Sequence, residues 1–144
     1  MKRNKLPAHY RRRWTKGTCE QCGVVDDDKG FFDRETIQQA IGICNVRNIP
    51  VVADAKQGPS VYDGAVVKCN ADYFNRHGRY SYDGSVVATF GDQSPLYFEA
   101  LGDPWQSIPS SSPVPCLNHV GAGDCFAAHL VLALASSLPL REAV

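Results

Sequence analysis

One stretch of the sequence, residues 114–128, reads VPCLNHVGAGDCFAA. A short apolar run at 114–117 leads into a glycine turn at 121–123, and a long apolar segment follows over 124–138. Apolar residues repeat at helical spacing in this segment, namely Phe126, Leu130, Ala133 and Leu134. Because the segment is apolar on nearly all sides, it predicts a helix buried against a sheet. Strand, tight turn and buried helix together indicate an α/β fold.

The chain before this stretch continues the alternation. Asp33 is a good helix N-cap, and apolar residues follow it at helical spacing, namely Ile37, Ala40, Ile41 and Cys44. Apolar runs at 49–53, 65–70 and 86–90 predict strands, and 96–100 suits the return strand of a hairpin. We therefore expect an α/β domain with a mostly parallel sheet and flanking helices over residues 24–144. Residues 71–84 read as a mixed polar stretch and 102–113 as a loop.

Polar side chains stand at or just beyond the ends of these apolar runs. They are Asp26, Asp27, Asp28, Asp54, Lys56, Asn70, Asp92 and Asp124. Because ligands of open parallel sheets bind beyond the carboxyl ends of the strands, we expect these residues on one rim of the domain.

Charge is unevenly distributed, although the formal net charge is zero. The first sixteen residues hold seven of the 15 Lys and Arg residues and no acid. Residues 1–23 thus form a basic arm. We favour a solvated, poorly ordered terminus over a nucleic-acid contact or a transit peptide as its interpretation.

The sequence has no run of 18 apolar residues and no apolar stretch near its start, so we expect no membrane span and a cytoplasmic location.

Six cysteines are present, but only Cys19 and Cys22 form a CxxC pair. A structural zinc site needs a second close pair of ligands, and the sequence offers none. We therefore expect neither a bound structural metal nor a disulfide, and interpret the other four cysteines as small hydrophobic residues.

The glycine turn at 121–123 suits the binding of an anion. Small residues at 121–123 let an anion approach the backbone closely, and the free N–H groups at a helix start favour phosphate. Asp124 in the first helical turn also fits plain capping, so the turn alone leaves an ordinary helix start as an alternative.

The pattern Asn118-x-x-Gly121-Ala122-Gly123-Asp124-x-Phe126 is similar to the second signature of PfkB-type carbohydrate kinases. This resemblance implies a ribokinase-like fold. It implies that Asp124 is the general base and that the backbone at Gly121, Ala122 and Gly123 forms an anion hole for the transferring phosphate. It also implies ATP and Mg²⁺ as cofactors.

Further segments resemble this family in the same order along the chain. Residues 26–30, 49–56 and 62–65 resemble motifs of the branch that phosphorylates heptose phosphate, and 86–91 resembles the strand beside the nucleotide. The resemblance implies nucleotide or phosphate contacts at Asn70, Gly91 and Asn118. It implies a substrate-binding or structural rim formed by Asp26, Lys29, Asp54 and Lys56.

Three positions depart from the family pattern. Tyr73 stands where a glutamate that helps to organise Mg²⁺ is usual, which puts the metal site in doubt. His119 replaces a small residue and is expected to be exposed, while His129 is expected to be a satisfied histidine of the core. The resemblance covers only the C-terminal half of the family's kinase domain, without the half that supplies most sugar contacts.

The leading hypothesis is ATP-dependent phosphoryl transfer to a hydroxyl of a sugar or sugar phosphate, an activity that we expect to be impaired in an isolated half domain. The alternative is a non-catalytic nucleotide- or phosphate-binding remnant, or one half of a two-chain assembly. Nucleic-acid binding through residues 1–16 is a third, weaker hypothesis. An open sheet edge where the other half would pack predicts self-association.

Overall fold

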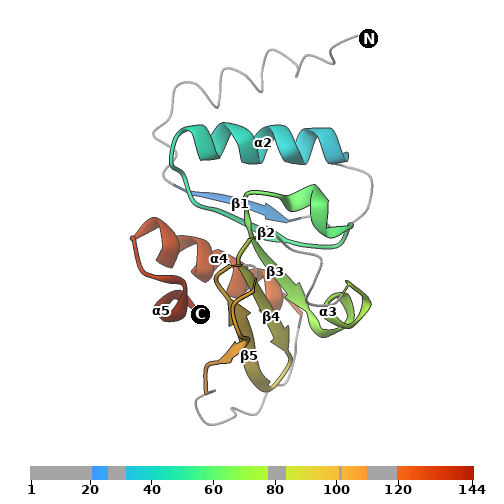
Figure 1. Ribbon diagram of the computed structural model, residues 1–144, viewed down its shortest axis with the longest axis vertical. Helices are drawn as coiled ribbons and strands as arrows, with labels where there is room; N and C mark the ends of the chain where they lie inside the picture. Colours follow the sequence, from blue (N-terminus) through green and yellow to red (C-terminus); the bar gives the residue numbers. More distant parts are fainter. Residues whose placement is uncertain (1–20, 26–31, 78–83, 101, 110–119) are drawn as a thin grey trace.

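The computed structural model describes residues 21–25, 32–77, 84–100, 102–109 and 120–144 (Figure 1). In chain order the elements are β1 (Cys22–Val25), α2 (Arg34–Val46), β2 (Val51–Asp54), the 3-10 helix η1 (Pro59–Tyr62), β3 (Val66–Asn70), α3 (Ala71–His77), β4 (Val86–Phe90), β5 (Gln93–Phe98), β6 (Gln106–Ser107), α4 (Ala122–Ala135) and α5 (Leu140–Ala143).

One sheet joins all six of these strands, in the order β1-β2-β3-β4-β5-β6. The first four strands run parallel to one another, whereas β5 and β6 pair in antiparallel fashion. The expected α/β class with a mostly parallel sheet is therefore confirmed. Figure 1 shows α2 and β1 towards one end of the molecule and the β4–β5 hairpin towards the other.

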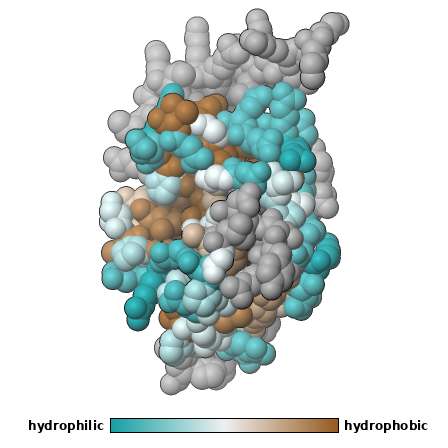
Figure 2. Space-filling view, in the orientation of Figure 1, coloured by the Kyte–Doolittle hydropathy of each residue, from teal (hydrophilic) through white to brown (hydrophobic). Residues whose placement is uncertain are grey.

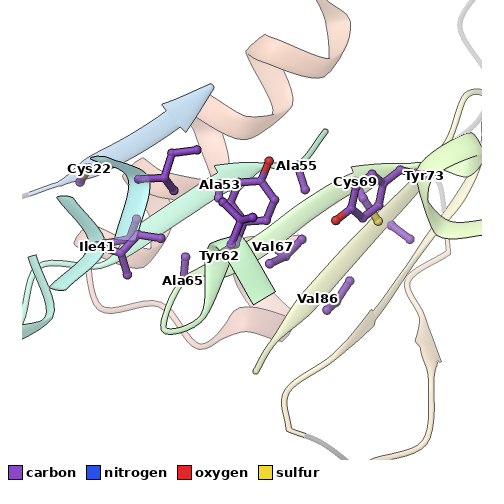
Figure 3. Packing of buried hydrophobic residues seen from close by; sticks show 14 of the residues in the cluster. Cys22, Ile41, Ala53, Ala55, Tyr62, Ala65, Val67, Cys69, Tyr73 and Val86 are labelled. Atoms are coloured by element: carbon purple, nitrogen blue, oxygen red, sulfur yellow. The ribbon is translucent and has the colours of Figure 1, made fainter. Parts of the chain in front are cut away.

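Alternation along the strands produces two separate apolar clusters. Val51 and Ala53 of β2 belong to the cluster under α2, together with Val67 and Cys69 of β3. Figure 3 shows this cluster, in which Tyr62 of η1 lies among residues of β2 and β3. The opposite face of the sheet packs against α4 and α5 through Val52, Val87, Tyr97, Leu130, Val131 and Leu140. The result is a three-layer α/β/α domain.

Helix α2 forms where its local signals predict it. Asp33 is the N-cap and accepts a hydrogen bond from the backbone N–H of Thr36 at 2.8 Å. The predicted positions Ile37, Ile41 and Cys44 are buried. The helix ends at Val46, and Asn48 beyond the C-cap has a left-handed backbone with φ of 55°.

Helix α3 was not expected, since residues 71–84 read as an irregular polar stretch. It forms because the Asn70 side-chain oxygen accepts a hydrogen bond from the Tyr73 backbone N–H at 2.9 Å and so caps the first turn. Tyr73 is buried, and its hydroxyl donates to the Gln57 carbonyl at 2.5 Å. Tertiary contacts thus stabilise a helix that is too short to show apolar periodicity.

Helix α4 packs against the sheet, as its apolar composition predicts. Ala127, Leu130 and Val131 are its buried residues, whereas Leu132 on another side of the helix is 49% exposed. His129, expected in the core, is exposed, and its Nδ1 lies 2.8 Å from the Cys125 carbonyl oxygen. The reason is that α4 forms an outer layer with the sheet on one side only. Composition alone does not show this.

Smaller differences concern element ends. β1 begins at Cys22, two residues before the expected domain start, and β5 covers 93–98 rather than 96–100. The strand expected at 114–117, the basic arm up to residue 20, Cys19 and Cys116 lie outside the described residues. Cys125 is exposed, not buried like Cys44.

Within the described part, none of the helices has the length and apolar composition needed to cross a membrane.

Candidate functional site

The carboxyl ends of the parallel strands bring several predicted residues to one edge of the sheet. Asp54 ends β2 and lies in register with Val25 of β1 and Lys68 of β3. Asn70 ends β3, and Gly91 follows β4 with a positive φ of 68°. These residues share the rim that the sequence predicts for them.

Lys68 also lies at this rim, although the sequence did not predict it as a site residue. Its ammonium nitrogen lies 3.1 Å from Asp54 Oδ2, and the two residues are only 3% and 4% exposed. The nitrogen of Lys56 is 3.7 Å from the other oxygen, Asp54 Oδ1. That oxygen has no hydrogen-bond partner among the described residues. Because a buried ammonium is costly without a partner, the contact with Asp54 stabilises the Lys68 side chain in this position.

Helix α4 begins above this pair, and its N-terminus has no side-chain cap. Gly121 is the N-cap with φ of 80°, a left-handed conformation that glycine adopts without strain, and no side chain caps the helix. The first backbone bond of the helix runs from the Cys125 N–H to the Gly121 carbonyl at 2.9 Å. The N–H groups of residues 122–124 have no acceptor within the helix, so they are open to an anion.

Gly123 lies where the N-terminus of α4 meets the Lys68 side chain. A Cβ atom added to Gly123 would lie 2.8 Å from the Lys68 ammonium nitrogen, so the lysine head lies directly against the first turn of α4. Lys68 projects from β3 to the α4 side because strand residues alternate, and Val67 and Cys69 face α2. The Asp54 carboxylate beside Lys68 offsets the repulsion between this ammonium and the positive end of the helix dipole. The N–H groups of residues 122–124 are left as donors for a negatively charged ligand.

Asp124 follows Gly123 in the first turn of α4, and its side chain is exposed. A carboxylate that must take a proton from a ligand needs such access. The structure therefore places the predicted base beside the open N–H groups and within one residue of the Lys68 contact.

Asn70 and Tyr73 have structural roles near the rim. The Asn70 oxygen caps α3, and Tyr73 is directed into the interior, where its hydroxyl bonds to the loop after β2. Lys56 is partly exposed, and its backbone N–H donates to the Tyr62 hydroxyl at 3.0 Å. These contacts fix the loop between β2 and η1 next to the rim.

Cys69 lies beside Lys68 in sequence but on the other face of β3. Burial is the main effect on its thiol and raises the pKa to about 12, although the Lys68 charge opposes this. Cys69 is therefore a neutral packing residue, in keeping with its interpretation as a small hydrophobe.

The described residues contain no group of three or more His, Cys, Asp or Glu side chains that could hold a metal ion. With Tyr73 buried and Asp54 paired to Lys68, this part of the protein does not form a metal cage. Of the other expected site residues, Asp26, Lys29 and Asn118 lie outside the described residues, as does His119.

Sequence reasoning missed Lys68, although a signal was available. Lys68 is a single cation inside the apolar run Ala65–Asn70, where a buried strand would be expected to carry none. Recognising its partner required knowing that β2 and β3 are neighbours and that α4 begins above them.

Comparison with known proteins places this geometry in a wider context. No family model matches the sequence, and no match to a curated protein was found. Solved structures do match. A putative ribokinase from Agrobacterium tumefaciens superposes with a TM-score of 0.63 at 18% identity, over 76% of this chain and 42% of that one. Adenosine kinase from Anopheles gambiae, in complex with P1,P4-di(adenosine-5) tetraphosphate, gives 0.61 at 20% identity, over 96% and 51%.

The fold is ribokinase-like. An ADP complex of Bacillus subtilis pyridoxal kinase matches as well, with a TM-score of 0.55 at 17% identity, over 77% of this chain and 55% of that one. The chain spans about half the length of the ribokinase-like kinases that it matches. At such low identity the likeness shows the ribokinase-like fold alone.

Proposed function

We propose that this chain binds the phosphates of ATP at the start of α4 and supports transfer of the terminal phosphoryl group to a hydroxyl of a sugar or sugar phosphate. The observation that carries the proposal is the buried Lys68 ammonium against Gly123, beneath a helix N-terminus without a side-chain cap. Two sources of positive potential at one point favour a multiply charged phosphate.

Each residue has a chemical role in this proposal. Lys68 and the N–H groups of residues 122–124 stabilise the negative charge on the phosphoryl oxygens. Asp124 accepts the hydroxyl proton as the hydroxyl oxygen bonds to the γ-phosphorus and the bond to the β-phosphate oxygen breaks, which releases ADP. Asp54 positions Lys68 through their 3.1 Å contact. Mg²⁺ would arrive with the nucleotide, since it binds mainly through phosphate oxygens and water.

A heptose phosphate is our proposed acceptor, on the strength of the motif resemblance at 26–30, 49–56 and 62–65. Two of these segments meet in the structure, because the Tyr62 hydroxyl accepts hydrogen bonds from the backbone N–H groups of Lys56 and Gln57, both at 3.0 Å. The expected cytoplasmic location stays a prediction.

A coupled ADP-release assay with MgATP and a panel of sugars, sugar phosphates and nucleosides tests the activity. We expect turnover that Asp124→Asn abolishes and that Glu99→Gln, which changes an exposed carboxylate just after β5, leaves unchanged. Turnover that survives Asp124→Asn would contradict the role of the base. A preference for nucleosides over heptose phosphate would contradict the proposed acceptor.

Non-catalytic nucleotide binding is the second candidate. It is favoured by the absence of an acidic metal-binding group among the described residues and by Tyr73, which is buried away from the rim. Thermal unfolding with added MgATP separates the candidates when combined with the assay. A raised midpoint without ADP release selects binding alone, and an unchanged midpoint at millimolar MgATP would exclude both.

A further inference from the structure

Two buried tyrosines hold the loop that follows β2. The Tyr62 hydroxyl accepts hydrogen bonds from the backbone N–H groups of Lys56 and Gln57, both at 3.0 Å. The Tyr73 hydroxyl donates to the Gln57 carbonyl at 2.5 Å. Tyr62 and Tyr73 are only 1% and 4% exposed, so side chains fixed in the core hold this backbone. The base of the Lys56 side chain is therefore set by contacts from η1 and α3.

The far end of the same loop is anchored to α2. Gln38 donates a hydrogen bond to the Ser60 carbonyl at 2.9 Å, and Arg34 donates to the Ser60 hydroxyl at 3.1 Å. The chain between Lys56 and Ser60 is thus fixed at both ends. Figure 2 shows hydrophilic surface on the right of the view, where α2 begins in Figure 1. A polar surface beside a fixed loop suits a charged ligand better than an apolar one.

The Lys56 side chain reaches from this loop to the rim. Its ammonium nitrogen lies 3.7 Å from Asp54 Oδ1, which is longer than a hydrogen bond, and its side chain is 33% exposed. The other oxygen, Asp54 Oδ2, accepts a hydrogen bond from the buried Lys68 ammonium at 3.1 Å. One carboxylate therefore faces two ammonium groups, and a single negative charge does not neutralise both.

The chemistry of Lys56 selects an anionic group as its ligand. A cation would be repelled by the two ammonium groups, whereas a phosphate oxygen accepts a charge-assisted hydrogen bond from lysine. Because the loop backbone is already fixed, binding orders only the arm of Lys56. Lys56 and Lys68 approach opposite oxygens of Asp54, and Lys68 lies against Gly123. A phosphate held by Lys56 is thus distinct from one at the start of α4.

We propose that Tyr62 and Tyr73 hold Lys56 in place to recognise the phosphate of a sugar-phosphate acceptor, while Lys68 and the start of α4 serve the nucleotide. This inference rests on the proposed phosphoryl transfer. It makes Lys56 the residue that distinguishes a sugar phosphate from the neutral sugar. Tyr62 and Tyr73 are positioning residues, because their hydroxyls contact the loop and not the ligand.

Titration calorimetry without nucleotide tests the role of Lys56. The probes are sedoheptulose 7-phosphate and sedoheptulose, which differ only in the phosphate. We expect the unmodified chain to bind the phosphate at least about tenfold more tightly, since hydrogen bonds to charged groups contribute that much. Lys56→Gln should abolish this preference, and Lys56→Arg should keep most of it. Both variants should bind MgATP as the unmodified chain does.

Conservative variants test the two positioning residues. Tyr73→Phe removes the donor to Gln57, and Tyr62→Phe removes the acceptor of two N–H groups, so each should lower the phosphate preference severalfold. Tyr97→Phe is the matched control, because the Tyr97 hydroxyl is also hydrogen-bonded, to Gln106 at 2.8 Å, but extends from β5. A merely structural role would lower the unfolding midpoint of all three variants and leave the ratio of the two affinities unchanged.

Several outcomes would overturn the proposal. Equal affinity for the two probes would do so, as would no binding of either or a preference that survives Lys56→Gln. An equal loss of MgATP affinity in Lys56→Gln would assign Lys56 to the nucleotide and would overturn it too. Failure of the proposed function has a different signature: the sugar phosphate binds through Lys56, but MgATP neither raises the unfolding midpoint nor yields ADP.

Discussion

Lys68 shows how one side chain combines stability with chemistry. Removing an ammonium from water is costly, and the cost is offset here by a 3.1 Å contact with an equally buried carboxylate. A pair of this kind adds little to stability compared with apolar residues of the same size. Its position against Gly123 therefore points to a ligand rather than to folding.

We predict that Lys68→Met destabilises the protein by about 3–5 kcal/mol, because Asp54 loses its buried partner and keeps only the partly exposed Lys56 at 3.7 Å. The double variant Lys68→Met/Asp54→Leu should recover most of that loss, because both charges are gone. Urea unfolding measures the stability of each variant. Neither variant should gain thermal stability from MgATP, and a full MgATP shift in the double variant would show that Lys68 does not contact phosphate.

We predict that Gly123→Ala separates binding from stability. Alanine favours helix by about 1 kcal/mol over glycine, but its Cβ would lie 2.8 Å from the Lys68 nitrogen and displace it. Nucleotide affinity should fall severalfold, as measured by titration calorimetry. Gly42→Ala in α2 is the control, since nothing lies within 4 Å of its added Cβ, and it should stabilise the fold without changing affinity.

At the scale of the element, the helices differ in how locally they are specified. α2 has an N-cap, apolar periodicity and a left-handed residue after its C-cap, all within a short stretch of chain. α3 has seven residues and depends on the Asn70 cap and on the burial of Tyr73 between neighbouring segments. The sequence therefore predicts α2 well and α3 poorly, because the stabilising contacts of α3 are distant in sequence.

We predict a pH-dependent contribution from the α2 cap. Hydrogen bonds from the side chain and backbone of Thr36 hold the pKa of Asp33 below its usual value. Ionised Asp33 therefore stabilises the fold fully above the unfolded-state pKa of about 4, and this contribution is lost as the pH falls through the lower folded-state pKa.

Asp33→Asn keeps a cap oxygen but does not ionise. Urea unfolding should show wild type to be more stable than this variant at neutral pH, with the gap closing in acid. Glu99→Gln serves as the control for a general loss of surface charge. A gap that widens as the pH falls would contradict the role of the ionised cap.

At the scale of the whole molecule, the described strands form a sheet with a well-protected centre and two edge strands, β1 and β6. β2 and β3 each have a strand on both sides and a helical layer on both faces. β6 has two residues, both exposed, at the opposite side of the sheet from β1. Local stability should follow this pattern.

We predict that amides in β2 and β3 exchange with solvent most slowly among the described strands, and those of β6 fastest. Native-state hydrogen exchange followed by mass spectrometry measures this order. Rapid exchange in β3 would be incompatible with Lys68 and Asp54 as a buried pair, since both would then be open to water.

The sequence by itself determined the α/β class, helix α2, the central strands and the glycine turn with Asp124. These features depend on residues close together in the chain: a cap three residues from its donor, apolar runs of strand length and a turn rich in glycine. Local backbone preference and burial are sufficient to specify them.

Only the tertiary structure decided that Lys68 and Asp54 form a buried pair under α4, that α3 exists, and that His129 lies at the surface. Each of these depends on which strands are neighbours and on which side of the sheet a helix packs. Burial and electrostatic energy act through space, so the partner of a charge can stand anywhere in the chain, and neither periodicity nor composition identifies it.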